Sequence, residues 1–157
     1  MIEAAFLNLM CNQPSKEIML QAGSQKAKDA VLIVRFTEWY CKARHCNQPR
    51  SPLQSEGAEA GIYRGSGSGT RGSDRIPMLC DRCADYARYA EQRTALCPNN
   101  PKPFCSVCEI KCYKSEMAEY SRQIMRYSGP RSIFSRYVPA AIRHALASRR
   151  YNKARVK

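Results

Sequence analysis

The spacing of seven cysteines and one histidine constrains the fold of this chain more than any other feature. The chain has nine cysteines in 157 residues, and two of them, Cys11 and Cys46, fall outside the pattern and are taken as incidental. The eight potential metal ligands are Cys41, His45, Cys80, Cys83, Cys97, Cys105, Cys108 and Cys112. A closed tetrahedral site takes four such ligands, so this set is enough for two sites.

The first four ligands predict a site of three cysteines and one histidine. Cys41 and His45 are four residues apart in a segment whose apolar residues recur every three to four positions from Lys26 onward. That periodicity predicts a helix with both side chains on one face. The Cys80-x2-Cys83 pair lies at the start of a second predicted helix, where the helix dipole favours the thiolate over the thiol.

The remaining cysteines predict a site of four thiolates. Cys105, Cys108 and Cys112 are spaced as a tight loop that can wrap one ion, and Cys97 can close the site from the end of the preceding helix. Three thiolates with an imidazole suit Zn²⁺, whereas four thiolates suit either Zn²⁺ or an iron–sulfur cluster. The spacing also leaves open a single site that uses four of the eight ligands, with the others as buried thiols.

The rest of the sequence favours metal or redox chemistry over disulfides. The first ten residues carry Glu3 and no basic residue, unlike a secretory signal. No apolar run approaches the roughly 18 residues of a membrane-spanning helix. We therefore expect a cytoplasmic protein with no membrane segment. A reducing compartment disfavours a disulfide framework, which leaves metal binding and thiol redox chemistry.

Apolar periodicity predicts a mainly α fold, a small helical domain over residues 26–148 organised by the metal ligands. Helices are expected over residues 26–45, 81–96, 116–128 and 131–148. Ser115 is the expected N-cap of the third helix and Gly129-Pro130 its end, and Pro139 is expected to kink the fourth.

Three segments lie outside these helices. Residues 46–78 lack periodicity and contain a Gly-Ser-Gly-Ser-Gly run at 65–69, which predicts a disordered, flexible insertion. Residues 1–25 are expected to form an N-terminal extension and residues 149–157 a loose basic tail. The sequence has no phosphate-binding glycine loop, nucleophile–base set or paired carboxylates, so nothing in it favours an enzyme of those classes.

The charge of the chain suggests a polyanionic partner. The formal net charge is +13, and from Lys111 onward twelve Lys or Arg residues face two Glu. A surface of this kind attracts nucleic acid and other polyanions without regard to sequence. The basic C-terminal third is therefore a candidate nucleic-acid contact, with an ordinary solvated basic face as the alternative.

Several runs of residues carry a family resemblance. They are Trp39-Tyr-Cys-x3-His45, Leu79-Cys-x2-Cys83, Ala90-x-Gln-Arg93, Cys97-Pro, Cys105-x2-Cys-x3-Cys-Tyr-Lys114 and Met125-Arg-Tyr-Ser-Gly-Pro-Arg131. Over residues 27 to about 150 the chain resembles the nitrous oxide-stimulated promoter family of small bacterial proteins, named for induction of its gene by nitrogen oxides. The resemblance implies no particular catalytic activity. The connection from His45 to Cys80 is longer here than in the family.

The ligand pattern and the resemblance together predict a metal-binding protein of the bacterial nitrosative-stress response, because nitric oxide attacks iron–sulfur clusters and zinc-bound thiolates. Two alternatives remain. One is a nucleic-acid-binding regulator whose fold the metal stabilises. The other is a thiol oxidoreductase that uses Cys80 and Cys83, or Cys105 and Cys108, as its redox pair.

Overall fold

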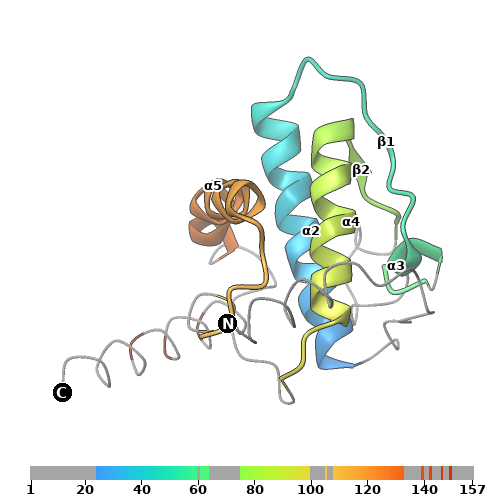
Figure 1. Cartoon of the computed structure of the whole chain (residues 1–157). Coiled ribbons are helices and arrows are strands. Elements are labelled where there is room, and N and C mark those ends of the chain that lie inside the picture. The colour runs from blue at the N-terminus through green and yellow to red at the C-terminus, as the bar shows by residue number, and fades with distance from the viewer. Residues whose placement is uncertain are drawn as a thin grey trace.

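The computed structural model describes residues 24–59, 61–63, 75–99, 105 and 108–132, together with positions 139, 142, 146 and 149. Within these residues the fold is mainly α, as predicted (Figure 1). Its elements in chain order are α2 (Gln25–Arg44), β1 (Ser51–Pro52), α3 (Glu56–Glu59), β2 (Met78–Leu79), α4 (Asp81–Ala95) and α5 (Ser115–Arg131). No helix in these parts of the chain is long and apolar enough to cross a membrane.

Helices α2 and α4 lie side by side and run in opposite directions (Figure 1). Ser24 caps α2, because its hydroxyl accepts a hydrogen bond from the backbone N–H of Ala27 at 3.1 Å. Buried small residues, Ala30 on α2 and Ala87 and Ala90 on α4, allow the two helices to approach closely. The opposite directions bring the end of α2 next to the start of α4.

Helix α5 lies across this pair (Figure 1) and is held by aromatic rings and one buried hydroxyl. The ring of Tyr120 meets the ring of Tyr40 on α2 edge-on, with centroids 5.8 Å apart, and that of Tyr86 on α4 at 5.4 Å. Ser128 is fully buried and donates a hydrogen bond of 2.8 Å to the carbonyl oxygen of Phe36. These contacts attach α5 to both helices of the pair.

The ends of α5 differ from those expected. Lys114, not Ser115, is the N-cap, and the helix continues through Gly129-Pro130 to Arg131. Pro130 lacks an N–H and removes one intrahelical hydrogen bond. Contacts on both sides of it compensate, since Ser128 is anchored to α2 and the Arg131 guanidinium donates to the carbonyl oxygen of Tyr127 at 2.7 Å. Local sequence signals carry no information about these tertiary contacts.

Much of the remaining chain lies outside the described residues. Of the fourth helix expected over 131–148, Arg131 belongs to α5, and Pro139, Ile142 and Leu146 are helical and exposed. The expected extension over residues 1–25 lies outside the described residues except for Ser24 and Gln25, which cap and begin α2. The Gly-Ser run and most of the basic tail also lie outside them.

Both ends of the segment expected to be a flexible insertion, residues 46–78, contain regular structure. Strands β1 and β2 pair antiparallel, with Ser51 opposite Leu79 and Pro52 opposite Met78. Four apolar side chains of this segment are buried, those of Leu53, Ile62, Tyr63 and Pro77. They do not recur at a helical or strand period, and strands of two residues are too short to predict.

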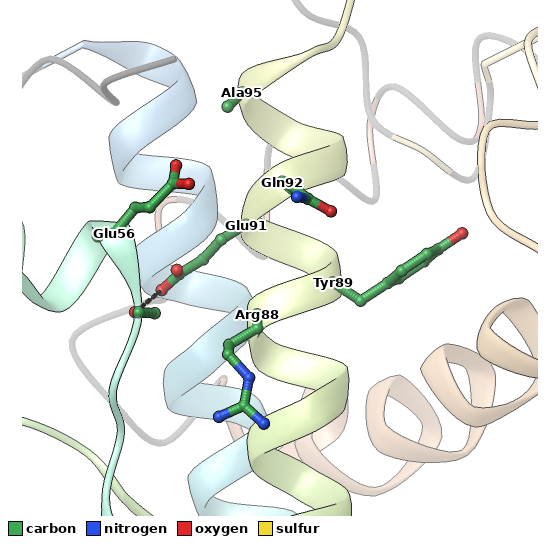
Figure 2. Close-up of a pocket in the computed structure, with 8 residues that line it drawn as sticks. Glu56, Arg88, Tyr89, Glu91, Gln92 and Ala95 are labelled. Atoms are coloured by element: carbon green, nitrogen blue, oxygen red, sulfur yellow. Dashed lines mark hydrogen bonds between the residues drawn. The ribbon is translucent and has the colours of Figure 1, made fainter. Parts of the chain in front are cut away.

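A buried glutamate ties this segment to α4. Figure 2 shows Glu91 reaching from α4 toward the residues that lead into α3. The hydroxyls of Ser55 and Tyr63 both donate hydrogen bonds to its buried carboxylate, that of Ser55 at 3.1 Å. A Cβ at Gly57 would lie 2.9 Å from the Glu91 carboxylate oxygen, so glycine is needed for this approach. Burial raises the pKa of Glu91 to about 7, although the hydrogen bonds from Ser55 and from the Gly57 backbone oppose the shift.

The raised pKa of Glu91 makes stability fall as the pH rises. The unfolded chain titrates this group near 4.5 and the folded chain near 7. Between those values the folded state holds one proton more than the unfolded state, so the free energy of unfolding decreases by about 3 kcal/mol from pH 4.5 to pH 8. Glu91→Gln stays neutral and keeps an oxygen for both hydroxyls, so we expect it to lack this loss.

The measurement is the difference in unfolding free energy between Glu91→Gln and the wild type, from denaturant titrations across this pH range. Taking the difference cancels the pH dependence that the two proteins share, such as that of the cysteines. The glutamine variant should gain about 3 kcal/mol on the wild type between the acid and alkaline ends. A difference that stays constant with pH would show that Glu91 ionises normally in the folded protein.

Candidate metal centre

The junction of α2 and α4 brings together one predicted set of ligands, Cys41, His45, Cys80 and Cys83. Their sulfur and nitrogen donor atoms all lie within 4.8 Å of one another, and this Cys3His group could hold a metal ion. Cys41 lies in the last turn of α2, His45 is its C-cap, Cys80 is the N-cap of α4 and Cys83 lies in the first turn of α4. The three cysteines are buried and the histidine is half-buried.

The distances within the Cys3His group fit a single four-coordinate ion. Nδ1 of His45 lies 3.2 Å from Sγ of Cys80 and 3.3 Å from Sγ of Cys83. Tetrahedral bonds of about 2.3 Å to sulfur and about 2.0 Å to nitrogen place those atoms about 3.5 Å apart. Because Nδ1 faces both sulfurs, it is the nitrogen available for coordination.

The ionisation of these groups also suits a cation. Burial raises the pKa of Cys41 and of Cys83, and the neighbouring thiols raise that of Cys83 further. Burial also lowers the pKa of His45, which keeps the imidazole neutral at neutral pH, the form that binds metals. A divalent cation supplies the positive charge that clustered thiolates need.

Groups around the ligands donate hydrogen bonds to sulfur. The hydroxyl of Tyr120 on α5 lies 3.2 Å from Sγ of Cys83, and the backbone N–H of Cys80 donates to Sγ of Cys41 at 3.3 Å. The guanidinium of Arg82 lies over the Tyr120 ring, 4.6 Å from its centroid. Such outer contacts orient the ligands of a metal and balance their charge. Sequence reasoning missed Tyr120, because its helical spacing indicated packing only and no pattern links it to Cys83.

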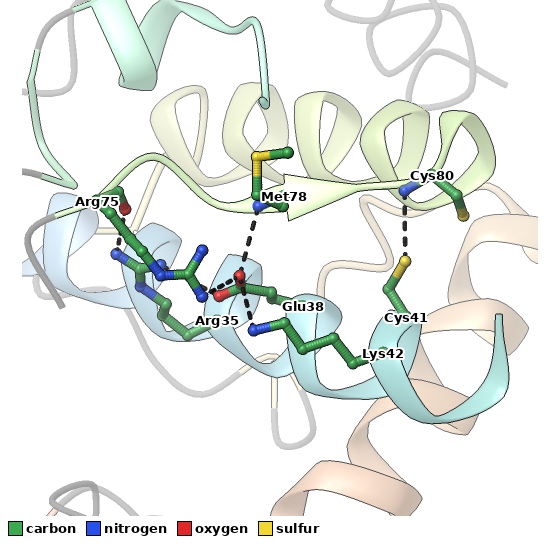
Figure 3. A network of polar contacts seen from close by, with 7 residues as sticks. All are labelled: Arg35, Glu38, Cys41, Lys42, Arg75, Met78 and Cys80. Carbon is green, nitrogen blue, oxygen red and sulfur yellow. Dashed lines mark hydrogen bonds and ion pairs between the residues drawn. The ribbon is translucent and has the colours of Figure 1, made fainter. Parts of the chain in front are cut away.

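A second network, one turn earlier on α2, is centred on Glu38, which is 2% exposed. Its carboxylate accepts contacts from Arg35 at 3.2 Å, Lys42 at 3.2 Å and Arg75 at 2.7 Å (Figure 3). Burial alone would raise the pKa of Glu38, but the charges of Lys42, Arg75 and Arg35 outweigh it and hold that pKa below its ordinary value. The buried carboxylate is therefore ionised at neutral pH.

The Glu38 network also positions a ligand. The backbone N–H of Met78 in β2 donates to the Glu38 carboxylate at 3.4 Å, and Cys80 follows two residues later (Figure 3). The N–H of Cys80 then donates to the sulfur of Cys41, one turn beyond Glu38 on α2. Two successive backbone contacts therefore align β2 with α2 and set where Cys80 enters the Cys3His group.

The other predicted ligands, Cys97, Cys105, Cys108 and Cys112, line one small cavity of about 20 Å³. They are less compact than the Cys3His group, which is the only set of three or more such donors this close together among the described residues. The four-thiolate site therefore stays a prediction. Cys46 is exposed and outside both groups, and Cys11 lies outside the described residues.

Comparisons with known proteins agree with the resemblance seen in the sequence. The model of the family described as "Nitrous oxide-stimulated promoter" matches residues 24–157. The protein YgbA of Escherichia coli (strain K12) is 35% identical over 63 residues, which are 40% of this chain and 53% of YgbA, so the chain spans about half the length of that relative. No solved structure matches the chain. The family match extends from the cap of α2 to the last residue, and the chain belongs to the nitrous oxide-stimulated promoter family.

Proposed function

We propose that this chain is a zinc-binding protein of the bacterial response to nitrogen oxides, in which Cys41, His45, Cys80 and Cys83 hold one Zn²⁺. The observation that carries the proposal is the convergence of four donor atoms within 4.8 Å of one another. They come from segments 35 residues apart in the chain. Bound zinc would supply the charge and the bonds that join α2 to α4, a structural role.

The donor set favours Zn²⁺ over an iron–sulfur cluster. Three thiolates with one imidazole is a common structural zinc set, whereas [2Fe–2S] and [4Fe–4S] clusters mostly use four cysteines. The short distances from Nδ1 of His45 to two sulfurs, 3.2 and 3.3 Å, leave room for one ion rather than for several iron and sulfide atoms. Four protein ligands complete the tetrahedral coordination of Zn²⁺, so an ion bound by this group would have no open position for catalysis.

The link to nitrogen oxides is supported by the name of the family and by the chemistry of zinc-bound thiolates, which nitric oxide attacks. A site built from free thiols also needs a reducing compartment, which supports a cytoplasmic location. Deleting the gene from its host should slow growth after nitric oxide exposure. The wild-type gene should restore growth, and Cys83→Ser should not.

The test of the zinc site is metal analysis of protein purified without oxygen, comparing wild type with Cys83→Ser and with Cys46→Ser. Cys83→Ser removes a buried ligand, and we expect it to contain about one zinc less per chain. Cys46→Ser is the matched control, because Cys46 is next to His45 in sequence but exposed. It should keep the wild-type zinc content.

Cobalt substitution of the wild type gives a second measurement that does not depend on how the variant folds. Co²⁺ bound by three thiolates and one imidazole should show the intense visible absorption of a tetrahedral site with sulfur-to-metal charge transfer. Finding iron with acid-labile sulfide in protein purified without oxygen would show that the group holds an iron–sulfur cluster and not zinc. Equal zinc content in all three proteins would show that Cys83 is not a zinc ligand.

A further inference from the structure

Four cysteines that the proposed zinc site does not use surround a cavity between the end of α4 and the start of α5. Cys97, Cys105, Cys108 and Cys112 all line it, and its volume is about 20 Å³. A space of this size holds about one water molecule or one ion. Four sulfur-bearing side chains around a space for a single ion are the composition of a tetrathiolate metal site.

Four thiols that line one small cavity repel one another once they have lost their protons. A bound cation reverses that balance, because it supplies the opposite charge.

The backbone at two of these cysteines is fixed to the helix pair. Nζ of Lys26, from the first turn of α2, donates a hydrogen bond of 2.7 Å to the carbonyl oxygen of Cys97. The hydroxyl of Tyr89 on α4 donates to the carbonyl oxygen of Cys112 at 3.5 Å and accepts from the backbone N–H of Lys114 at 2.9 Å. Half of the ligand set is thus held in place by the fold.

Cationic and donor groups next to the cavity match the charge of such a site. A divalent cation with four thiolates carries a net charge of about −2. Arg93 lines the cavity, and the Lys111 ammonium donates to the carbonyl oxygen of Cys108 at 3.0 Å. The amide nitrogen of Asn99 lies 3.5 Å from the sulfur of Cys108 and donates to it. These groups offset part of that negative charge.

Exposure distinguishes this group from the Cys3His group. Cys105 is exposed and the other three are half-buried, whereas all three cysteines of the Cys3His group are buried. Water and competing ligands can therefore reach the sulfur of Cys105 without unfolding of the core. Local opening costs least where few buried contacts hold a segment.

We propose that Cys97, Cys105, Cys108 and Cys112 form a second metal site, which binds a soft divalent cation such as Zn²⁺ through four thiolates. The second site exchanges its ion faster than the Cys3His group does, so that one chain combines a slow site with a fast one. The two groups share no residue, so the existence of the second site does not rest on the proposed zinc site, whereas the comparison of the two exchange rates does.

The experiment measures zinc content and the rate of zinc release to a coloured chelator, in protein purified without oxygen. The wild type should release zinc in two phases, and the rate constant of the fast phase should exceed that of the slow phase by at least about ten-fold. The double variant Cys105→Ser/Cys108→Ser should lose the fast phase and about one zinc per chain, and keep the helical circular dichroism of the wild type. Cys83→Ser should keep the fast phase, and Cys46→Ser, the exposed control, should keep both.

Unchanged zinc content and release in the double variant would overturn the second site. A disulfide between two of these cysteines in the anaerobic wild type, found by mass spectrometry after alkylation, would also overturn it. Cadmium-substituted wild type gives an answer even where a variant fails to fold. Two cadmium NMR signals, one with the chemical shift of cadmium bound by four sulfurs, would support the proposal. A single signal, with the chemical shift of cadmium bound by three sulfurs and one nitrogen, would refute it. Failure of the Cys3His site alone would instead leave only the four-sulfur signal.

Discussion

Removing the proposed zinc ion from the wild-type protein is expected to lower its free energy of unfolding by roughly 5 kcal/mol, and its thermal midpoint by roughly 20 °C. The reason is that the Cys3His group joins the end of α2 to the start of α4. When a metal ion binds only the folded state, its binding free energy adds to the free energy of unfolding. Without the ion, buried thiols and an imidazole remain at that junction with only weak hydrogen bonds among them.

Circular dichroism at increasing temperature, with and without a strong chelator, measures this effect. Cys46→Ser should respond to the chelator as the wild type does. Cys83→Ser should have a low midpoint from the start and respond less, because its Cys3His group is already incomplete. A chelator that strips all zinc and leaves the midpoint unchanged would show that the metal has no structural role.

Glu38→Ala is expected to destabilise the protein by about 3–5 kcal/mol, because it leaves the buried guanidinium of Arg35 without its carboxylate partner. Arg35 is 4% exposed. The side chains of Lys42 and Arg75 are 45% and 46% exposed, so water can solvate them after the change. The loss of stability therefore comes mainly from the buried charge of Arg35, which no longer faces the carboxylate of Glu38.

The matched control is Glu119→Ala on α5. Both glutamates pair with an arginine three residues later or earlier in a helix, but the Glu119–Arg122 pair is on the surface. Exposed pairs contribute little, so Glu119→Ala should change stability far less in the same denaturant titration. Equal losses in the two variants would mean that the burial of Glu38 contributes nothing. Replacing both partners, as Arg35→Met/Glu38→Leu, should recover much of the Glu38→Ala loss, since no buried charge remains.

Glu38→Ala should also weaken metal binding, because Glu38 aligns β2 and so positions Cys80. This readout separates a general loss of stability from a local one. Zinc affinity measured by competition, under conditions where both variants are folded, should fall for Glu38→Ala and remain unchanged for Glu119→Ala.

Spacing alone predicted the parts of this protein that depend on local periodicity. Cys41 and His45 lie on one face because four residues make about one helical turn, and the Cys80-x2-Cys83 pair lies at a helix start for the same local reason. Helices α2 and α4 followed from their apolar positions. Opposite directions of these two helices then suffice to bring the four side chains together.

The features that were missed depend on contacts between distant residues. Leu53 and the pair Ile62-Tyr63 are short apolar stretches among polar residues, and contacts with distant parts of the chain, such as that of Tyr63 with Glu91, accompany their burial in the core. Glu91 is an acidic residue, which a pattern assigns to the surface, yet the hydroxyls of Ser55 and Tyr63 make its burial possible. The continuation of α5 through Pro130 has the same kind of cause.

The pairing of β1 with β2 holds together the two ends of the segment that joins them. Both sides of the segment between Tyr63 and Arg75 are anchored, by the buried ring of Tyr63 and by the bond from Arg35 to the carbonyl oxygen of Arg75. Each doubling of the chain length between two fixed ends costs only about 0.6 kcal/mol of loop-closure entropy. Residues can therefore be added between these anchors without displacing the cysteines that follow them. A peptide tag or a reporter domain can be inserted there while the Cys3His group is left intact.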